Sequence, residues 1–305
     1  MKVYLSEPID RTARERLAAR FELVDTFDRP EELDGIVTRN VAVPGEVIRR
    51  AERLKVIAVH GVGTDSVDMD AARERGVAVR TVPGAGTESV AELTVGMLLA
   101  MSRKLKLADQ GLRQGRFSRF GDPALLGTEV WGKRLGVVGA GSIARRVAEI
   151  MGAAFSCETY CYHPRRTAEE LAALGLRKVR TLEELFARMD MVSVHVPLTD
   201  QTRGMIGRPQ FACASPALLF CNTSRGGVVD EQALYEALTG GQIRAAASDV
   251  FEREPPDKDM PLLALDNFIA TFHVGVTTAE ALARLGGAVA DIVIGALCPE
   301  EGAIL

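Results

Sequence analysis

The stretch RLGVVGAGSIARRVAEIMGAAFSCETYCYHP, residues 134–164, decides the fold. It begins with the apolar run 135–138, passes through the glycine turn GAGSIA at 139–144, and continues with apolar residues at helical spacing. A second run typical of a strand follows at 156–162. A strand, a tight glycine turn and a helix in this order place backbone N–H groups and the positive helix end where a pyrophosphate can bind. We therefore predict a dinucleotide-binding unit; the alternative is a βαβ unit whose glycines serve only packing.

Composition restricts the class of protein. The chain has 305 residues, enough for about two domains, and its 47% hydrophobic and 26% charged content is ordinary for a globular protein. A net charge of -4 argues against a nucleic-acid surface, because no basic stripe is available to pair with phosphates. No apolar run reaches the ~18 residues of a membrane span, and the N-terminal residues lack a signal-peptide core. The five cysteines, an odd number, fit reduced thiols. We expect a cytoplasmic protein that binds neither nucleic acid nor membrane.

Residues 1 to about 104 alternate strand-like and helix-like segments. Such alternation is typical of a parallel sheet with covering helices. The segment is too long and too regular for a linker, so we predict a separate first domain that precedes the glycine turn. Its predicted strands lie at 3–5, 22–25, 35–38, 56–59 and 77–80.

The alternation resumes from Gly132 to about His273, which predicts a second parallel sheet. Between the two sheets, residues 89–114 read as one extended helix. We interpret its basic residues at 103–106 as a solvated face, and a phosphate site is the alternative. A final helix is expected after the capping residues Thr277 and Thr278. Further predicted strands of the second sheet lie at 190–196, 217–222, 243–249 and 268–271.

Ligands of open α/β sheets bind at the carboxyl ends of the strands, so polar residues there are the candidates for chemistry. His273 follows a predicted strand, and its ring suits either a general acid/base or a structural hydrogen bond. Glu254 either fixes the tautomer of that ring or lies in solvent beside two prolines. Arg225 precedes two glycines that would let a ligand approach the backbone. Its planar fork suits a carboxylate, and a turn arginine in solvent is the alternative.

The order of these segments resembles the D-isomer-specific 2-hydroxyacid dehydrogenases. The resemblance extends over nearly the whole chain, and several motifs in one order are far more specific than a glycine turn alone. The motifs are HGVGTDSVD (60–68), VPGAGTESVAE (82–92), GAGSIA (139–144), HVPLTDQTR (195–203), NTSRGGVVD (222–230), DVFEREP (249–255) and HVG (273–275).

This resemblance implies an α/β fold of two domains. A Rossmann-type doubly wound dinucleotide-binding domain, residues 105–275, is expected to be inserted in a flavodoxin-like parallel α/β substrate domain, residues 1–104 and 276–305. The last helix would then return to the first domain. The resemblance also implies a homodimer.

Catalysis is assigned by the resemblance to Arg225, Glu254 and His273. In such enzymes the histidine protonates the carbonyl oxygen while the nicotinamide hydride attacks C2, and the glutamate tunes the histidine. The arginine binds the carboxylate and carbonyl of the substrate. The amides of Val62 and Gly63 are implied to help hold the carboxylate, so the expected substrate-binding residues are Val62, Gly63, Arg225 and His273.

We predict NADP as the preferred cofactor, and NAD is the alternative. NAD-dependent members usually carry an acid about 20 residues past the glycines, where it bonds the ribose 2′-OH. This chain has Tyr-His-Pro-Arg-Arg at 162–166. No carboxylate would repel a 2′-phosphate there, and two arginines can pair with it. The alternative is that these arginines lie in solvent at the start of a helix. The expected cofactor-binding residues are Gly139, Gly141, Ser142, Ile143, His163, Arg165, Arg166, His195, Val196, Pro197, Thr202, Thr223, Ser224 and Asp249.

We therefore expect an oxidoreductase that interconverts a small 2-keto acid and the D-2-hydroxy acid, with glyoxylate or hydroxypyruvate as the favoured substrate. One alternative is a phosphoglycerate dehydrogenase-like enzyme that uses NAD, for which Arg39 is the one nearby cation. Another is a dinucleotide-sensing corepressor, in which the cofactor gates protein association. No metal site is expected, because Cys157, Cys161 and His163 share one face of a strand without a fourth ligand.

Overall fold

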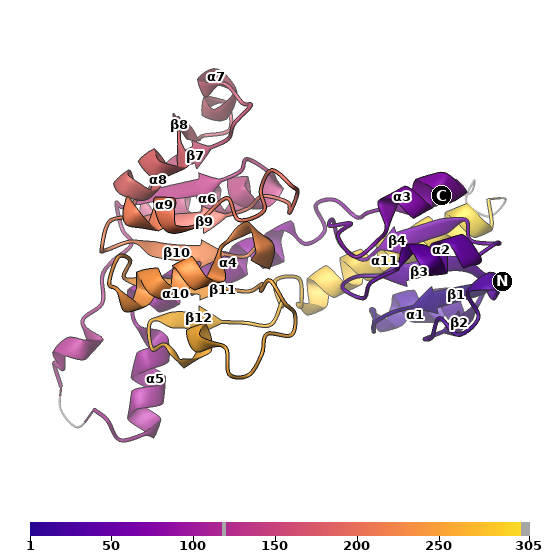
Figure 1. Cartoon of the computed structure of the whole chain (residues 1–305), viewed down its shortest axis with the longest axis horizontal. Coiled ribbons are helices and arrows are strands. Elements are labelled where there is room, and N and C mark those ends of the chain that lie inside the picture. Colours follow the sequence, from indigo (N-terminus) through magenta and orange to yellow (C-terminus); the bar gives the residue numbers. More distant parts are fainter. Residues whose placement is uncertain (118–119, 300–305) are drawn as a thin grey trace. The chain divides into compact units, whose positions relative to one another are not determined.

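The computed structural model describes residues 1–117 and 120–299, which form two compact units (Figure 1). Unit 1 comprises Met1–Gly86 and the chain from Val276 onward, and unit 2 comprises Thr87–Gly275. Unit 2 is therefore inserted into unit 1 along the chain. Within the described ranges, no helix is both long enough and apolar enough to cross a membrane.

Unit 1 is built on a five-stranded parallel sheet. Its strand order, β2-β1-β3-β4-β5, is that of a flavodoxin-like sheet, as predicted. Parallel strands need crossover connections, so helices cover both faces: α1 and α11 pack on one face, and α2 and α3 on the other. The bounds are β1 Lys2–Leu5, α1 Arg11–Ala18, β2 Glu22–Val24, β3 Leu33–Thr38, α2 Gly45–Arg50, β4 Val56–Val59, α3 Met69–Arg75, β5 Ala78–Arg80 and α11 Ala279–Leu297.

Helix α11 ties the last described residues to unit 1. Thr278 is its N-cap, and the side chain accepts a hydrogen bond from the Ala281 N–H, as its place before an apolar periodic run predicts. Its buried residues Leu285, Val289 and Val293 share one core cluster with α1 and the sheet of unit 1. The predicted last helix is confirmed.

Unit 2 is built on a seven-stranded parallel sheet with the order β12-β11-β10-β9-β6-β7-β8. If β6, the strand before the glycine turn, is counted as the first strand, the order from β8 to β12 is 3-2-1-4-5-6-7, as in a Rossmann sheet. The direction of the strand order reverses between β6 and β9. The bounds are α4 Thr87–Ser102, α5 Leu105–Arg113, β6 Arg134–Val138, α6 Ser142–Phe155, β7 Glu158–Tyr162, α7 Ala168–Ala172, β8 Arg177–Val179, α8 Leu182–Arg188, β9 Met191–Val194, α9 Arg208–Ala212, β10 Leu219–Asn222, α10 Glu231–Thr239, β11 Ala245–Ser248 and β12 Phe268–Ala270.

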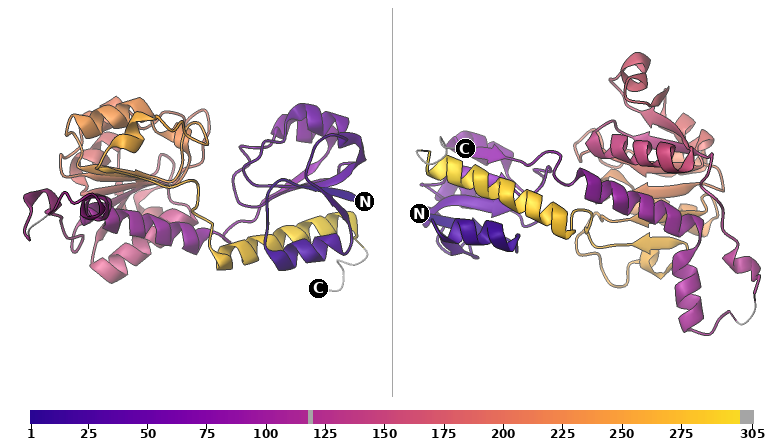
Figure 2. Two further views of the ribbon diagram at one scale, coloured as in Figure 1. Left: turned by 90° about the horizontal axis from the view of Figure 1, so that it is seen from below. Right: turned by 180° about the vertical axis from the view of Figure 1, so that it is seen from behind.

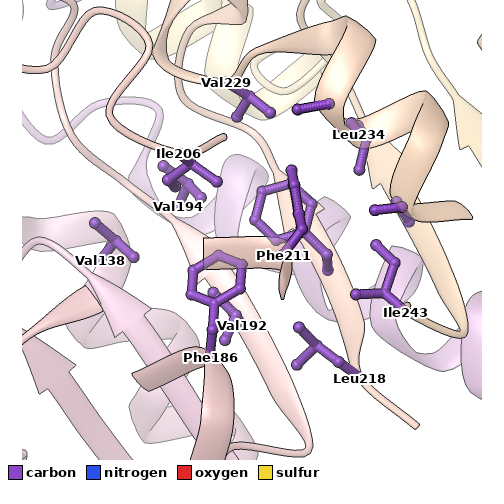
Figure 3. Close-up of a cluster of buried hydrophobic side chains, with 14 of the residues drawn as sticks. Val138, Phe186, Val192, Val194, Ile206, Phe211, Leu218, Val229, Leu234 and Ile243 are labelled. Atoms are coloured by element: carbon purple, nitrogen blue, oxygen red, sulfur yellow. The ribbon is translucent and has the colours of Figure 1, made fainter. Parts of the chain in front are cut away.

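Two helical layers enclose this sheet (Figure 2). Helices α4 and α6 share a core cluster on one face, and α8, α9 and α10 share a cluster on the other. In the second cluster Phe186, Phe211 and Phe220 pack with ring centroids 5.5–5.8 Å apart; Figure 3 shows Phe186 and Phe211 within it. The strands between the layers are almost wholly buried, so the residues free to meet a ligand lie at the strand ends.

The single helix predicted over residues 89–114 is wrong. Lys104 adopts the left-handed conformation (φ +51°) and separates α4 from α5. The basic residues are also not simply solvated: Lys104 Nζ donates to the Ala124 carbonyl at 2.7 Å, and Lys106 Nζ donates to the carbonyls of Leu265 and Phe268 at 2.8 Å each. These tertiary contacts hold the break in the helix.

The division between the units falls after Gly86, whereas the sequence pattern predicts it after residue 104. Helix α4 belongs with unit 2, because its residues Met97 and Leu98 are buried in the core shared with α6 and β10. The segment 87–104 is therefore reassigned to the inserted unit. The second division, before Val276, coincides with the predicted one.

Candidate active site

The carboxyl edge of the seven-stranded sheet gathers most of the predicted site residues. All strand pairs are parallel, so the residues that follow each strand emerge at the same edge. Each of six strands contributes at least one predicted residue or its neighbour there. They are Gly139 after β6, His163 after β7, His195 after β9, Thr223 after β10, Asp249 after β11 and His273 after β12.

The glycine turn has the form that a pyrophosphate requires. Gly139 has φ +98°, and a Cβ atom there would lie 2.6 Å from the His195 carbonyl oxygen, so only glycine fits. A Cβ atom at Gly141 would meet no atom within 4 Å, so this position opens to space in front of α6. Ser142 begins that helix, and no side chain caps its N-terminus. The N–H groups of the first turn are thus available to an anion, which fits a dinucleotide.

His273 and Glu254 form a hydrogen-bonded pair. His273 Nδ1 lies 2.8 Å from Glu254 Oε2, and the side chains are 25% and 27% exposed, so both are shielded but reachable. Burial alone would raise the pKa of Glu254. The net effect is nevertheless a pKa below the usual value, because the carboxylate accepts hydrogen bonds from His273 and the Phe251 N–H and lies near the charges of His273 and Arg225. The carboxylate is therefore ionised at neutral pH. It fixes His273 Nδ1 as the donor and leaves Nε2 for a substrate.

Asp249 holds the backbone of the loop that carries His273. Its Oδ1 accepts hydrogen bonds from Thr271 Oγ1 and the Val274 N–H, and its Oδ2 accepts one from the Gly275 N–H. The carbonyl of Asp249 also accepts the His273 N–H at 2.7 Å. His273 itself has φ +48°, a conformation that costs a non-glycine residue energy and that this network maintains. The sequence motif did not reveal this structural role.

Arg225 lies on the loop after β10. The loop is fixed by Asn222, whose Oδ1 accepts from the Ser224 N–H and hydroxyl and whose Nδ2 donates to the Arg225 carbonyl. The charge of Arg225 acts on Glu254, which places the guanidinium near the histidine pair. A cation, an ionised acid and an imidazole are therefore brought together by three separate loops.

Gly226 lets two of these loops touch backbone to backbone. A Cβ atom there would lie 1.8 Å from the carbonyl carbon of Phe251 and 2.3 Å from the Glu252 nitrogen, in the loop that carries Glu254. We expect Gly226→Ala to lower the free energy of unfolding by about 1–3 kcal/mol or more and to reduce turnover, because the loops must separate. Urea denaturation and steady-state kinetics measure both effects. Gly227→Ala is the matched control, because its Cβ would meet only the flexible ends of Arg203 and Leu198 at 3.3–3.4 Å. Equal effects of the two variants would contradict this role of Gly226.

A cationic cluster follows β7. The His163 Nδ1 accepts the N–H groups of Arg165 and Arg166, at 3.3 and 3.1 Å, which shapes the turn. Burial and the charges of Arg166, Arg165 and Lys178 lower the pKa of His163, so the ring is neutral. In the part of the chain that the structure describes, neither guanidinium pairs with a carboxylate. Lys178, from β8, donates to the Arg166 carbonyl at 2.5 Å; sequence reasoning missed it, because its place depends on the sheet order.

Comparisons with known proteins agree with this geometry. Residues 95–275 match the family described as D-isomer specific 2-hydroxyacid dehydrogenase, NAD binding domain. A hydroxypyruvate reductase of Thermotoga maritima is 37% identical over 297 residues, which are 93% of this chain and 94% of that protein. The chain belongs to the D-isomer specific 2-hydroxyacid dehydrogenases.

Two further members of the family are similar. A D-3-phosphoglycerate dehydrogenase of Methanocaldococcus jannaschii is 43% identical over 268 residues, 88% of this chain and 50% of that protein. The chain thus spans about half the length of that relative. The solved structure of an NADPH-dependent glyoxylate/hydroxypyruvate reductase from Sinorhizobium meliloti, in complex with NADP and malonate, has a TM-score of 0.86 at 29% identity, over 96% of this chain and 92% of that one. This NAD(P)-binding family includes enzymes of both substrate types.

Several residues that the family resemblance assigned to the cofactor make internal hydrogen bonds in this chain. Thr202 Oγ1 donates to the Pro197 carbonyl, the Thr223 hydroxyl lies 2.9 Å from that of Thr94, and Ser224 Oγ donates to Asn222. These hydroxyls stabilise the conformation of their own loops. We therefore expect these loops to contact the cofactor through backbone groups.

His195 lies after β9 and next to the glycine turn. Its Nε2 lies 2.9 Å from Ser193 Oγ, and its Nδ1 is buried without a partner in the described residues. Burial lowers the pKa of His195 to about 3, so this ring is neutral and no proton carrier at physiological pH. Val196 contacts the same turn, since a Gly139 Cβ would lie 3.0 Å from its Cγ1.

The remaining predicted residues, Val62 and Gly63, belong to unit 1 and follow β4. Val62 is 55% exposed, which suits a position beside a ligand. The adjacent His60 is buried, and burial together with the charge of Arg39 lowers its pKa to about 4. His60 is therefore neutral and adds no charge to this edge of the sheet.

Proposed function

We propose that this chain reduces a small 2-keto acid to the D-2-hydroxy acid with NADP(H), with glyoxylate or hydroxypyruvate as substrate. The 2.8 Å pair of His273 and Glu254 beside Arg225 is the observation that carries the proposal. An acid/base whose tautomer is fixed by an ionised carboxylate, next to a guanidinium, is what carbonyl reduction of a keto acid requires.

Each of the three side chains has one task in this reaction. Arg225 binds the substrate carboxylate and carbonyl oxygen, which orients the carbonyl carbon. His273 gives a proton from Nε2 to the carbonyl oxygen as it becomes an alcohol, and takes it back during oxidation. Glu254 stays ionised and stabilises the protonated imidazole through Nδ1. A bound nicotinamide supplies or accepts the hydride at C2.

The cationic cluster after β7 supports NADP as the cofactor. Arg165 and Arg166 are not neutralised by an acid in the described residues, and Lys178 adds a third positive charge. A 2′-phosphate would find charge-assisted donors there, and the ribose hydroxyl of NAD would find no carboxylate.

We expect Arg165→Gln and Arg166→Gln each to raise the KM for NADPH by about 10- to 100-fold, because each removes a charged hydrogen bond to phosphate. The KM for NADH should change less than threefold, since NADH lacks that phosphate. Initial rates at varied cofactor concentration measure both. An equal rise for the two cofactors, or an NADH efficiency tenfold above that of NADPH in the unmodified enzyme, would contradict the assignment.

The charge at the carboxyl edge of unit 1 favours an unphosphorylated substrate. Arg39 forms an ion pair with Glu7 at 3.6 Å, and the same carboxylate accepts the N–H groups of Arg39 and Asn40. With His60 neutral, this group carries no net positive charge for a phosphate dianion. Phosphoglycerate dehydrogenase activity is the second candidate, because the 43% identity to such an enzyme exceeds the 37% to the hydroxypyruvate reductase.

We further propose a homodimer that forms through residues 105–117 and 120–131. Five of the most exposed large apolar side chains lie in these ranges, and α5 leads away from the sheet of its own unit (Figure 1). Such a patch on a monomer marks an association surface. The five are Leu105, Leu112, Phe120, Leu126 and Trp131.

Leu112→Glu should shift the protein from dimer to monomer, because Leu112 is 72% exposed and an acid there would be buried without a partner on association. Sedimentation velocity at micromolar concentration measures the change. Val41→Glu, at an exposed apolar residue of unit 1, is the control and should leave the dimer intact. A wild-type monomer, or a dimer that survives Leu112→Glu, would contradict the proposal.

The oxidation of NADPH and NADH against glyoxylate, hydroxypyruvate and 3-phosphohydroxypyruvate tests the proposed function. We expect the highest kcat/KM with NADPH and one of the two small acids. A phosphorylated substrate that is preferred at least tenfold would favour the second candidate. Absence of turnover with every acid, in protein that binds nucleotide, would refute both.

A further inference from the structure

A cavity of about 170 Å³ lies in unit 2 at the amino edge of β11 and β12. Arg244 and Ala245 form its wall where β11 begins, and Asp266 and Asn267 do so just before β12. Asp249 and His273 follow the opposite ends of these strands. At ~3.3 Å per residue a four-residue strand spans roughly 13 Å, so the cavity is separate from the carboxyl edge described above.

The cavity combines an apolar interior with excess positive charge. Apolar walls come from Ala100 and Met101 of α4, Leu107 of α5 and Ile269 of β12. The charged lining residues are the cations Lys104, Lys106 and Arg244 and one acid, Asp266. This acid already forms an ion pair with Arg116, at 3.1 Å. An apolar chamber lined by three cations and a single acid suits an organic anion better than a neutral molecule.

Arg244 supplies a donor that nothing in the described chain satisfies. Its Nη1 atom is buried and has no hydrogen-bond partner, which is costly for a guanidinium. Lys106 adds a charge whose hydrogen bonds go only to the neutral carbonyls of Leu265 and Phe268. The break at Lys104 brings this part of α5 to the cavity, and no side chain caps the N-terminus of α5.

We propose that this cavity is a second ligand site, which binds a small organic carboxylate with a compact apolar body. The carboxylate accepts from the Arg244 guanidinium, and the body fills the space between Met101, Leu107 and Ile269. An engineered apolar cavity of about 150 Å³ takes a benzene ring, so a body of about that size fits. Inorganic phosphate has no apolar part and leaves this space empty.

Calorimetric titration of the full chain with benzoate tests the site, with benzamide and inorganic phosphate as matched ligands. We expect saturable binding of benzoate with a Kd of about 1 mM or tighter. Benzamide should bind about tenfold more weakly or worse, because it lacks the charge that Arg244 pairs with. Phosphate that binds as tightly as benzoate, and loses this binding in Leu107→Trp, would overturn the proposal, since the apolar walls would then contribute nothing; phosphate bound at the cationic cluster after β7 would be unaffected by that substitution.

Variants separate this site from Arg225, which also suits a carboxylate. Arg244→Met should weaken benzoate binding about tenfold or more, and Leu107→Trp, which fills the cavity, should abolish it even if Arg244→Met does not fold. Arg180→Met, at an exposed arginine of the same unit, should change nothing. Benzoate binding that persists in Leu107→Trp and in folded Arg244→Met, or no saturable heat below about 10 mM, would overturn the proposal.

Discussion

Substitution of His273 by asparagine is expected to lower kcat for keto-acid reduction by about 10²- to 10⁴-fold. The imidazole is the group that the geometry offers to protonate the carbonyl oxygen, since Glu254 holds its Nδ1 at 2.8 Å and leaves Nε2 for the substrate. Asparagine is the appropriate replacement because it tolerates the left-handed backbone (φ +48°) of this position, and so leaves the loop in place.

Cofactor binding is the control for the His273→Asn variant. The glycine turn and the cationic cluster are untouched, so the Kd for NADPH, measured by fluorescence, should change less than threefold. A kcat within tenfold of the unmodified enzyme would show that another group carries the proton. Weaker NADPH binding by the same factor as the loss in kcat would indicate a disturbed fold instead.

Substitution of Arg225 by glutamine is expected to lower kcat/KM for the keto acid by about 10²- to 10⁴-fold. Two charged hydrogen bonds to the substrate are lost, at about 1.5–3 kcal/mol each, and ten-fold in rate corresponds to about 1.4 kcal/mol. Arg225→Lys keeps the charge and loses the planar fork, so we expect an intermediate loss, mostly in KM. Steady-state kinetics over a range of hydroxypyruvate concentrations measures both.

The two Arg225 variants also test how the substrate is held. If lysine restores full activity, charge alone suffices and bidentate recognition is refuted. If glutamine has no effect, Arg225 does not contact the substrate. Urea denaturation of both variants is the control: Asn222 fixes the loop and the Arg225 guanidinium adds a hydrogen bond to the Ser224 carbonyl, so the free energy of unfolding should fall by no more than about 1.5–3 kcal/mol.

Sequence patterns predicted both sheets, because strands, glycine turns and caps are encoded locally, whereas the insertion of one unit into the other was implied by the family resemblance. The glycine spacing at 139–144 is visible in the sequence, whereas the close approach of Gly139 to the His195 carbonyl, which excludes a Cβ atom there, is visible only in the structure. Strand β8 went unrecognised, since it is three residues long and only Val179 is buried. The break at Lys104 was missed for a different reason: it is held by carbonyls of residues 124, 265 and 268, which are distant in sequence.

The catalytic set was predicted by motif, and the structure adds what positions these side chains. The carboxylate of Asp249 binds three groups of the His273 loop, and Gly226 lets the Arg225 and Glu254 loops touch. Such support depends on contacts between segments that are separate in the chain, and no spacing rule reveals it. The same holds for Lys178, which reaches the Arg166 carbonyl only because β8 lies beside β7.

The most direct test of the central claim is the reduction of hydroxypyruvate with NADPH, followed by chiral analysis of the product. The account predicts one D-glycerate formed for each NADPH oxidised, because Arg225 and His273 fix which face of the carbonyl receives the hydride. L-glycerate, a racemic product, or no product from protein that binds NADPH would contradict it.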